Sequence, residues 1–240
     1  MRILITNDDG IRGEGLRLLA MWARNLGEIV VCAPKSEKSA CSQSIVLKRP
    51  FSCVRSDIFA DLSIEAWEID STPADCVRFG LLKLGRFDLV LSGINNGFNT
   101  GHFINYSGTC GAAFEATAMG VPAVALSTLA GKLPEAAADL PRILKFFQER
   151  KLLQKHPLYN VNIAPGFRDF TITKAEPPFG SENFRDCGNG LYQASLDLSM
   201  WDNRELDISC DMEALFAGYC SVTPLDNERT AMHVYEELRT

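Results

Sequence analysis

The sequence predicts an α/β fold in which a Rossmann-like, mostly parallel sheet is flanked by helices. Three observations lead to this class. Short continuous apolar runs at residues 2–6, 28–33, 87–91 and 123–127 have the length and composition of buried parallel strands. Segments with apolar residues at helical spacing separate several of these runs. Polar loops follow the runs that end at residues 6 and 91, and ligands bind beyond the carboxyl ends of strands in such sheets.

The composition is that of a globular protein and excludes several classes of function. Of the 240 residues, 46% are hydrophobic, and a net charge of −6 provides no basic surface for nucleic acid or an anionic membrane. The eight cysteines form neither a CxxC pair nor a zinc-like cluster with histidine, so we expect free thiols. Residues 1–20 do not resemble an export signal, and no apolar run approaches the ~20 residues that span a membrane. We therefore expect a cytoplasmic protein.

The first part of the chain has the pattern of a β-loop-α-β unit followed by less regular strands. A helix is expected after the acidic loop at 7–10, with Gly27 at its end, before the strand at 28–33. A serine-rich loop covers 34–44, and loose alternation predicts two or three strands between 45 and 70. Thr72 and Pro73 suit an N-cap and the first helical position, so a helix is expected to about residue 84.

The second part continues the alternation of strands and helices up to about residue 163, and the pattern after that is less regular. Helices are expected at 109–119 and 134–150, strands at 123–127 and 158–163, and hairpins within 169–198. A short helix, a strand and a terminal helix are expected at 212–217, 219–223 and 228–239. We predict one domain over 1–240, with a core of about 1–165 and 212–225, a hairpin appendage of about 166–211, and a C-terminal helix at about 226–240.

The strand at 87–91 leads into a stretch rich in glycine and asparagine, residues 92–101, and then to a second polar turn at Ser107, Gly108 and Thr109. The stretch holds more glycine and asparagine residues than an ordinary turn needs. Backbone amides at the start of the following helix can bind an anion, although Ser107 or Thr109 can equally serve as an N-cap. We expect a polar, phosphorylated ligand between the two halves of this stretch.

Two adjacent carboxylates, Asp8 and Asp9, follow the first buried strand. They repel each other, and a divalent cation such as Mg²⁺ would supply the counter-charge. A turn that caps the next helix is the alternative. Asn95, Asn96 and Asn99 can offer an oxygen to a hard metal or an N–H to a phosphate, and their grouping favours function over turn geometry.

Other candidate groups carry weaker signals. Ser39 could present a hydroxyl to the same ion, but its type does not distinguish it from the other serines of the 34–44 loop. There is no GxxxxGK[ST] motif, so a P-loop NTPase is not supported. His102 has no neighbouring aspartate or serine pattern, which argues against a triad hydrolase.

Together these residues resemble the SurE family, the survival-protein-E nucleotidases. The resemblance rests on five motifs in order, at residues 3–10, 33–39, 71–77, 92–97 and 106–113, and on a closing strand at 218–225. It covers nearly the whole chain. The sequence departs from the family pattern at Ala40 and Phe103 and matches weakly over 177–212.

The resemblance implies a metal-dependent phosphomonoesterase that hydrolyses nucleoside 5′- and 3′-monophosphates. It also implies one divalent ion per subunit (Mg²⁺, Mn²⁺ or Co²⁺) and a homodimer or homotetramer built by exchange of C-terminal elements. The implied metal ligands are Asp8, Asp9, Ser39 and Asn95, and catalysis is assigned to Asp8 and Asp9. The implied phosphate contacts are Asn96, Ser107, Gly108 and Thr109.

Two other functions are compatible with paired carboxylates and an asparagine-rich loop. A metal-dependent transferase acting on a nucleotide sugar would release no phosphate from plain nucleotides. A nucleotide-sensing regulatory oligomer would bind nucleotide and metal without turnover, although four ligands converging on a metal are more than sensing requires.

Overall fold

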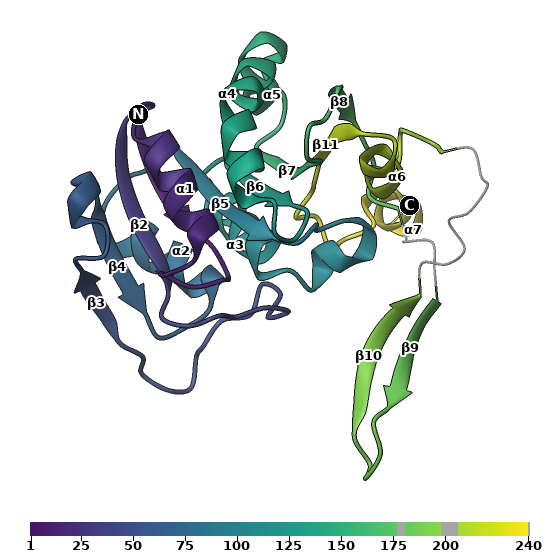
Figure 1. Ribbon diagram of the computed structural model, residues 1–240, viewed down its shortest axis with the longest axis horizontal. Helices are drawn as coiled ribbons and strands as arrows, with labels where there is room; N and C mark the ends of the chain where they lie inside the picture. Colours follow the sequence, from purple (N-terminus) through teal and green to yellow (C-terminus); the bar gives the residue numbers. More distant parts are fainter. Residues whose placement is uncertain (177–180, 198–205, 240) are drawn as a thin grey trace.

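The computed structural model describes residues 1–176, 181–197 and 206–239. Its main sheet has nine strands in the order β3-β4-β2-β1-β5-β6-β7-β11-β8, and a separate hairpin, β9–β10, projects away from it (Figure 1). The strands of the main sheet are β1 (Arg2–Thr6), β2 (Glu28–Pro34), β3 (Cys53–Ser56), β4 (Glu65–Ile69), β5 (Leu89–Asn96), β6 (Ala123–Thr128), β7 (Leu158–Ile163), β8 (Asp169–Ile172) and β11 (Tyr219–Pro224). The hairpin is formed by β9 (Ser181–Asp186) and β10 (Tyr192–Asp197).

Helices cover both faces of the sheet, with α1 and α4 on one face and α2 and α3 on the other (Figure 1). Because successive strand residues point to opposite faces, Ile3 and Ile5 pack under α1 and α4, whereas Leu4 packs under α2 and α3. Each face therefore has its own hydrophobic core. The helices are α1 (Glu14–Ala23), α2 (Pro73–Lys83), α3 (Gly108–Ala118), α4 (Leu133–Arg150), α5 (Leu152–Lys155), α6 (Asp211–Phe216) and α7 (Met232–Arg239), with 3-10 turns η1 (Ala60–Leu62) and η2 (Gly101–Asn105).

The strand order reverses between β1 and β5, at the centre of the sheet. Strands β4, β2, β1, β5, β6 and β7 pair in parallel, whereas β3 and β11 run antiparallel to their neighbours β4 and β7. The chain moves outward from β1 through β2 and β4 on one side, and from β5 through β6 and β7 on the other. Ligands of doubly wound sheets bind in the crevice at such a reversal.

The predicted α/β fold is confirmed, and α1, β5 and α7 differ from their predicted bounds by more than two residues. Helix α1 ends at Ala23, before Gly27, where an added Cβ would lie 1.9 Å from the carbonyl oxygen of Met1. Gly27 therefore permits close backbone packing and does not end the helix. Strand β5 continues to Asn96, so the glycine-rich loop begins later than predicted. Helix α7 begins at Met232, four residues after the predicted start.

The predicted appendage is divided between two places in the structure. Strand β8 pairs with β11 at the edge of the main sheet, and only β9–β10 stands apart (Figure 1). The rest of the predicted appendage includes residues 177–180 and 198–205, which lie outside the described residues. Among the described helices, none has the length and apolar character needed to cross a bilayer.

Candidate active site

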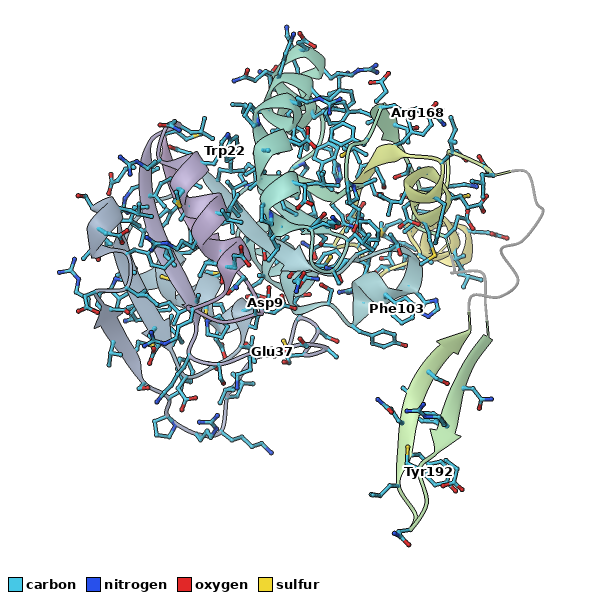
Figure 2. The ribbon with its side chains drawn as sticks, in the orientation of Figure 1. Asp9, Trp22, Glu37, Phe103, Arg168 and Tyr192 are labelled. Atoms are coloured by element: carbon cyan, nitrogen blue, oxygen red, sulfur yellow. The ribbon has the colours of Figure 1, made fainter. Side chains whose placement is uncertain are left out.

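Segments that follow three neighbouring strands meet the N-terminus of α3 at the reversal point of the sheet. The loop after β2 reaches the loop after β1, because the amide of Lys38 donates to the carbonyl oxygen of Asp8 at 2.7 Å. The start of α3 reaches the same loop through Thr109. Figure 2 shows Asp9 and Glu37 close together at this edge of the sheet. The topology thus collects polar groups that are far apart in the sequence.

Asp8 is nearly fully buried and is held by the first turn of α3. Its Oδ1 accepts a 2.5 Å hydrogen bond from the Thr109 hydroxyl, and the backbone amides of Gly108 and Thr109 also favour its charged form. Burial nevertheless dominates and raises the pKa of Asp8 above its ordinary value. Asp8 is therefore held in a fixed position, and its hydrogen bonds do not fully compensate for the loss of hydration of its negative charge.

Asp9 is more accessible to solvent than Asp8 and lies near two other carboxylates, those of Asp8 and Glu37. Burial, the Asp8 carboxylate and the Glu37 carboxylate together raise the pKa of Asp9 to about 6, and the backbone amide of Asn96 opposes this shift. Ser39 donates its hydroxyl to Glu37 Oε1 at 2.7 Å, which places Ser39 beside the same group of carboxylates. A cation at this place would relieve the repulsion.

The two asparagines at the end of β5 are oriented by their own hydrogen bonds. The pairing of β5 with β6 shifts register between Ser92 and Asn95, and such an irregularity turns the end of a strand. Asn95 donates its Nδ2 to the carbonyl of Gly97 at 2.7 Å, so its Oδ1 is the atom suited to a metal. Asn96 accepts at Oδ1 from the amide of Gly131 at 2.8 Å, so its Nδ2 is the atom suited to a phosphate oxygen.

The start of α3 approaches Asp8 so closely that only glycine fits there. An added Cβ at Gly108 would lie 2.8 Å from Asp8 Cβ and 2.9 Å from Cys41 Sγ. The Ser107 hydroxyl accepts from the amide of Cys110 at 3.1 Å, so Ser107 is the N-cap of α3. Of the predicted phosphate contacts, Gly108 and Thr109 therefore face Asp8, and Ser107 caps its own helix.

The sequence predicts that Asn99 binds the ligand together with Asn95 and Asn96, but the structure gives Asn99 a different role. It is buried, and its Nδ2 donates to the Ser127 hydroxyl at 2.9 Å. Asn160 and Asn162 on β7 both donate to the Asn99 carbonyl, and Asn162 also accepts from the Asn99 amide. Asn99 thus anchors the glycine-rich loop in a buried polar cluster instead of reaching into the site.

The donor set fits a hard divalent cation. Within residues 1–176, 181–197 and 206–239, no three His, Cys, Asp or Glu side chains gather as a metal-binding group. A metal site here therefore has to combine the two carboxylates of Asp8 and Asp9 with neutral oxygens, which Ser39 and Asn95 can provide. Magnesium is commonly bound by one or two carboxylates with the remaining positions left to water and phosphate. The uncompensated charge on Asp8 and Asp9 supports the same fit.

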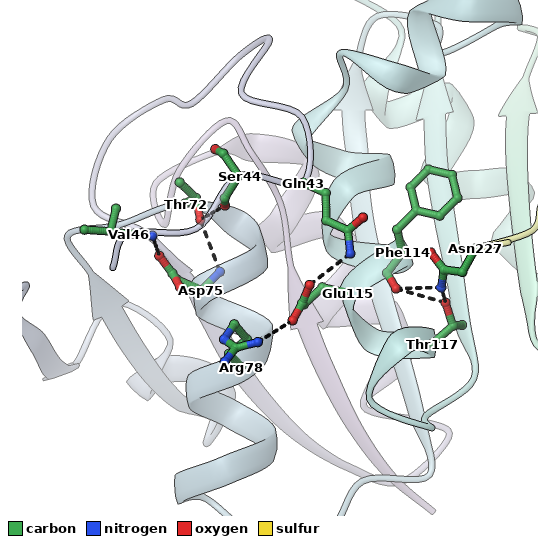
Figure 3. Close-up of polar contacts among 10 residues, drawn as sticks. All are labelled: Gln43, Ser44, Val46, Thr72, Asp75, Arg78, Phe114, Glu115, Thr117 and Asn227. Atoms are coloured by element: carbon green, nitrogen blue, oxygen red, sulfur yellow. Dashed lines mark hydrogen bonds and ion pairs between the residues drawn. The ribbon is translucent and has the colours of Figure 1, made fainter. Parts of the chain in front are cut away.

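Sequence reasoning missed two groups of residues near the site. Glu37 lies two residues before Ser39, and its carboxylate type was the only available signal. Gln43 belongs to a hydrogen-bond network around Glu115. Gln43 Nε2 donates to Glu115 Oε2 at 2.9 Å, and Arg78 donates to Glu115 Oε1 at 2.8 Å (Figure 3). No local motif links Gln43 to Glu115, because they are 72 residues apart in the chain.

Known proteins are similar to this chain over its whole length. The family model described as "Survival protein SurE" matches residues 3–177. A protein named 5′-nucleotidase SurE from Geobacter metallireducens is 36% identical, with 100% of this chain and 97% of the relative aligned. A protein named 5′-nucleotidase SurE 1 from Thermus thermophilus is 34% identical over 99% of this chain and 96% of its own. The crystal structure of the SurE protein from Aquifex aeolicus superimposes with a TM-score of 0.83 at 29% identity, covering 100% of this chain and 98% of that one.

Proposed function

The chain belongs to the SurE family, and from this premise we propose that it is a nucleotidase that hydrolyses nucleoside 5′-monophosphates, and 3′-monophosphates, to nucleoside and phosphate. The observation that carries the proposal is the convergence of Asp8, Asp9 and the oriented amides of Asn95 and Asn96 at the reversal point of the sheet. Phosphoryl transfer depends mainly on positioning and on electrostatic stabilisation, and these groups supply both.

We assign one divalent cation, Mg²⁺, Mn²⁺ or Co²⁺, to Asp8, Asp9, Ser39 and Asn95. When bound, such an ion neutralises charge on the phosphoryl oxygens and acidifies coordinated water. Two observations support the proposal. The charges of the two carboxylates are buried and uncompensated, and the bond from Asn95 Nδ2 to Gly97 leaves Asn95 Oδ1 as the ligand atom.

The chain's own residues then have separate tasks. We assign to Asn96 Nδ2, and to Ser107, Gly108 and Thr109 at the start of α3, the phosphate oxygens that do not face the metal ligands. Asp8 is held rigidly by Thr109, whereas Asp9 is more accessible, so we assign to Asp9 the removal of a proton from the attacking water. The water oxygen bonds to phosphorus, the ester P–O bond breaks, and the nucleoside oxygen takes a proton from solvent.

We also propose a cytoplasmic homodimer or homotetramer. Free thiols at all eight cysteines fit a reducing compartment. Large apolar side chains are exposed on the hairpin and on α7, and exposed apolar groups of this kind mark association surfaces. They are Phe184, Leu191 and Tyr192 on the hairpin, and Met232, Val234, Tyr235 and Leu238 at α7.

A phosphate-release assay over nucleoside monophosphates tests the proposal. Activity should be lost in EDTA and restored by Mg²⁺ or Mn²⁺. Asp8→Asn and Asn95→Ala should each lower kcat/KM by about tenfold or more, the scale of one lost transition-state contact. The control is Asp57→Asn, which neutralises an exposed carboxylate between β3 and η1 and should leave kcat/KM unchanged. Full activity in EDTA, or nucleotide binding without phosphate release, would contradict the proposal.

A further inference from the structure

A cavity of about 410 Å³ opens beside the predicted phosphate contacts, on the outer side of the first turns of α3. Its wall includes Ser107, which caps α3, together with Gln43, Phe114 and Arg229. A second hollow of about 350 Å³ lies on the other side and also includes Phe114 and Arg229. Arg229 thus lines both hollows, and the first hollow also includes Ser107, which directly precedes the α3 amides that face Asp8.

The amide of Gln43 is held in one orientation. The carboxylate of Glu115, paired with Arg78, can only accept hydrogen bonds, so the Gln43 atom that meets it is Nε2 (Figure 3). The other amide atom, Oε1, accepts from Arg229 Nη2 at 3.4 Å. The wall of the cavity therefore presents one fixed acceptor and the donors of a guanidinium.

The segment that carries Arg229 is fastened to α3. Asn227 donates its Nδ2 to the carbonyl of Phe114 at 2.9 Å and to the Thr117 hydroxyl at 2.5 Å (Figure 3). The Arg229 guanidinium lies 5.7 Å from the centroid of the Phe114 ring. These contacts bring a residue near the C-terminus of the chain to a pocket that begins at Ser107.

We propose that this cavity holds the nucleobase of the substrate and that Arg229 makes the enzyme prefer 6-oxopurines, guanine and hypoxanthine. The inference rests on the proposed nucleotidase function. A guanidinium fork matches two adjacent acceptors, and O6 and N7 of a 6-oxopurine form such a pair. Adenine replaces O6 by an amino donor, which faces the guanidinium unfavourably, and uracil has no second acceptor adjacent to O4, because its N3 carries a hydrogen. The apolar surface of Phe114 suits the face of the base.

The test compares kcat/KM for GMP, IMP, AMP and UMP, with p-nitrophenyl phosphate as a substrate that lacks a nucleobase. The wild-type protein should prefer GMP and IMP over AMP by about tenfold, within the range of one bidentate contact. Arg229→Ala should reduce this preference to less than threefold, mainly through KM, and leave p-nitrophenyl phosphate hydrolysis unchanged. Arg229→Lys keeps the charge but not the fork, and should also lose most of the preference.

The matched control is Arg239→Ala, which removes the same charge from α7 at an exposed position that lines neither hollow. It should keep the wild-type preference. A wild-type protein that hydrolyses all four nucleotides equally, or an Arg229→Ala protein that retains the preference, would overturn the assignment of Arg229 and leave the nucleotidase function standing. Absence of phosphate release from every nucleotide would instead overturn the nucleotidase function, and this inference with it.

Discussion

Replacing Gly111 by alanine should disturb the site from a distance, because the loop after β2 is seated directly on this residue. An added Cβ at Gly111 would lie 2.2 Å from the carbonyl oxygen of Ser42 and 2.9 Å from the amide nitrogen of Gln43. Both contacts are with backbone, so no side-chain rotation relieves them, and the loop has to retreat by roughly 1 Å to regain ordinary contact. That movement strains the 2.9 Å bond from the Ser42 amide to the Tyr106 carbonyl and the 2.9 Å bond from Gln43 to Glu115.

The expected cost follows from these contacts. Overpacking costs about 1–3 kcal/mol, and each weakened hydrogen bond about 1 kcal/mol. The higher helix propensity of alanine returns about 1 kcal/mol. A net destabilisation of about 2–4 kcal/mol should lower Tm by roughly 4–16 °C for a chain of this size. Because the same loop carries Ser39, kcat/KM for GMP should fall by about tenfold.

The measurement is thermal unfolding by circular dichroism, paired with the phosphate-release assay. Gly80→Ala is the matched control, since it is also a helical glycine and its Cβ would meet only the side chain of Leu4, at 2.7 Å from Cδ2. Only a side chain has to move, so this variant should keep its activity, although overpacking against the fully buried Leu4 should cost about 1–3 kcal/mol of stability. A Gly111→Ala protein with wild-type Tm and wild-type kcat/KM would refute the view that the seating of this loop on α3 holds the site.

Two further outcomes are expected. In EDTA, stability should fall as pH rises from about 4 to about 7, because the pKa of Asp9, raised to about 6, lets the folded state keep a proton that the unfolded state has lost. Asp9→Asn should therefore raise Tm at pH 7.5 by about 2–4 °C (about 1 kcal/mol after solvent screening) and leave it unchanged at pH 4; a parallel offset at both values would contradict this. Asp211→Asn should weaken the 2.7 Å bond from the Gly101 amide to Asp211 Oδ2 and speed hydrogen exchange at Gly101, and unaltered exchange there would count against its anchoring role.

Much of the fold was predictable because its determinants are local. The apolar runs that became β1, β2, β5 and β6 are short and continuous, as buried parallel strands are, and Thr72 and Pro73 do start α2. The meeting of Asp9 with the end of β5 at Asn96 was also within reach, because the carboxyl ends of parallel neighbours lie at one edge. The end of α1 could not be predicted from the sequence, because Gly27 packs against the backbone of Met1 and does not end its own helix.

The polar supports of the site could not be predicted in the same way. Asn99 resembles Asn95 and Asn96 in type and position, yet it is buried against Asn160 and Asn162. The relevant signal was the pair of asparagines two residues apart in β7, which point to the same face of an otherwise apolar strand. Their partner lies about 60 residues earlier in the chain, and only the tertiary structure identifies it.

The buried polar cluster around Asn99 has a consequence for how the protein is made. All the proposed reacting groups, from Asp8 to Thr109, leave the ribosome in the first half of the chain, but Asn160, Asn162 and Asp211 emerge in the second half. A nascent chain or fragment that stops near residue 150 would therefore contain every group needed for hydrolysis and lack the supports that hold them in register. Such a fragment should be inactive by itself and regain activity when a complementary C-terminal fragment is added.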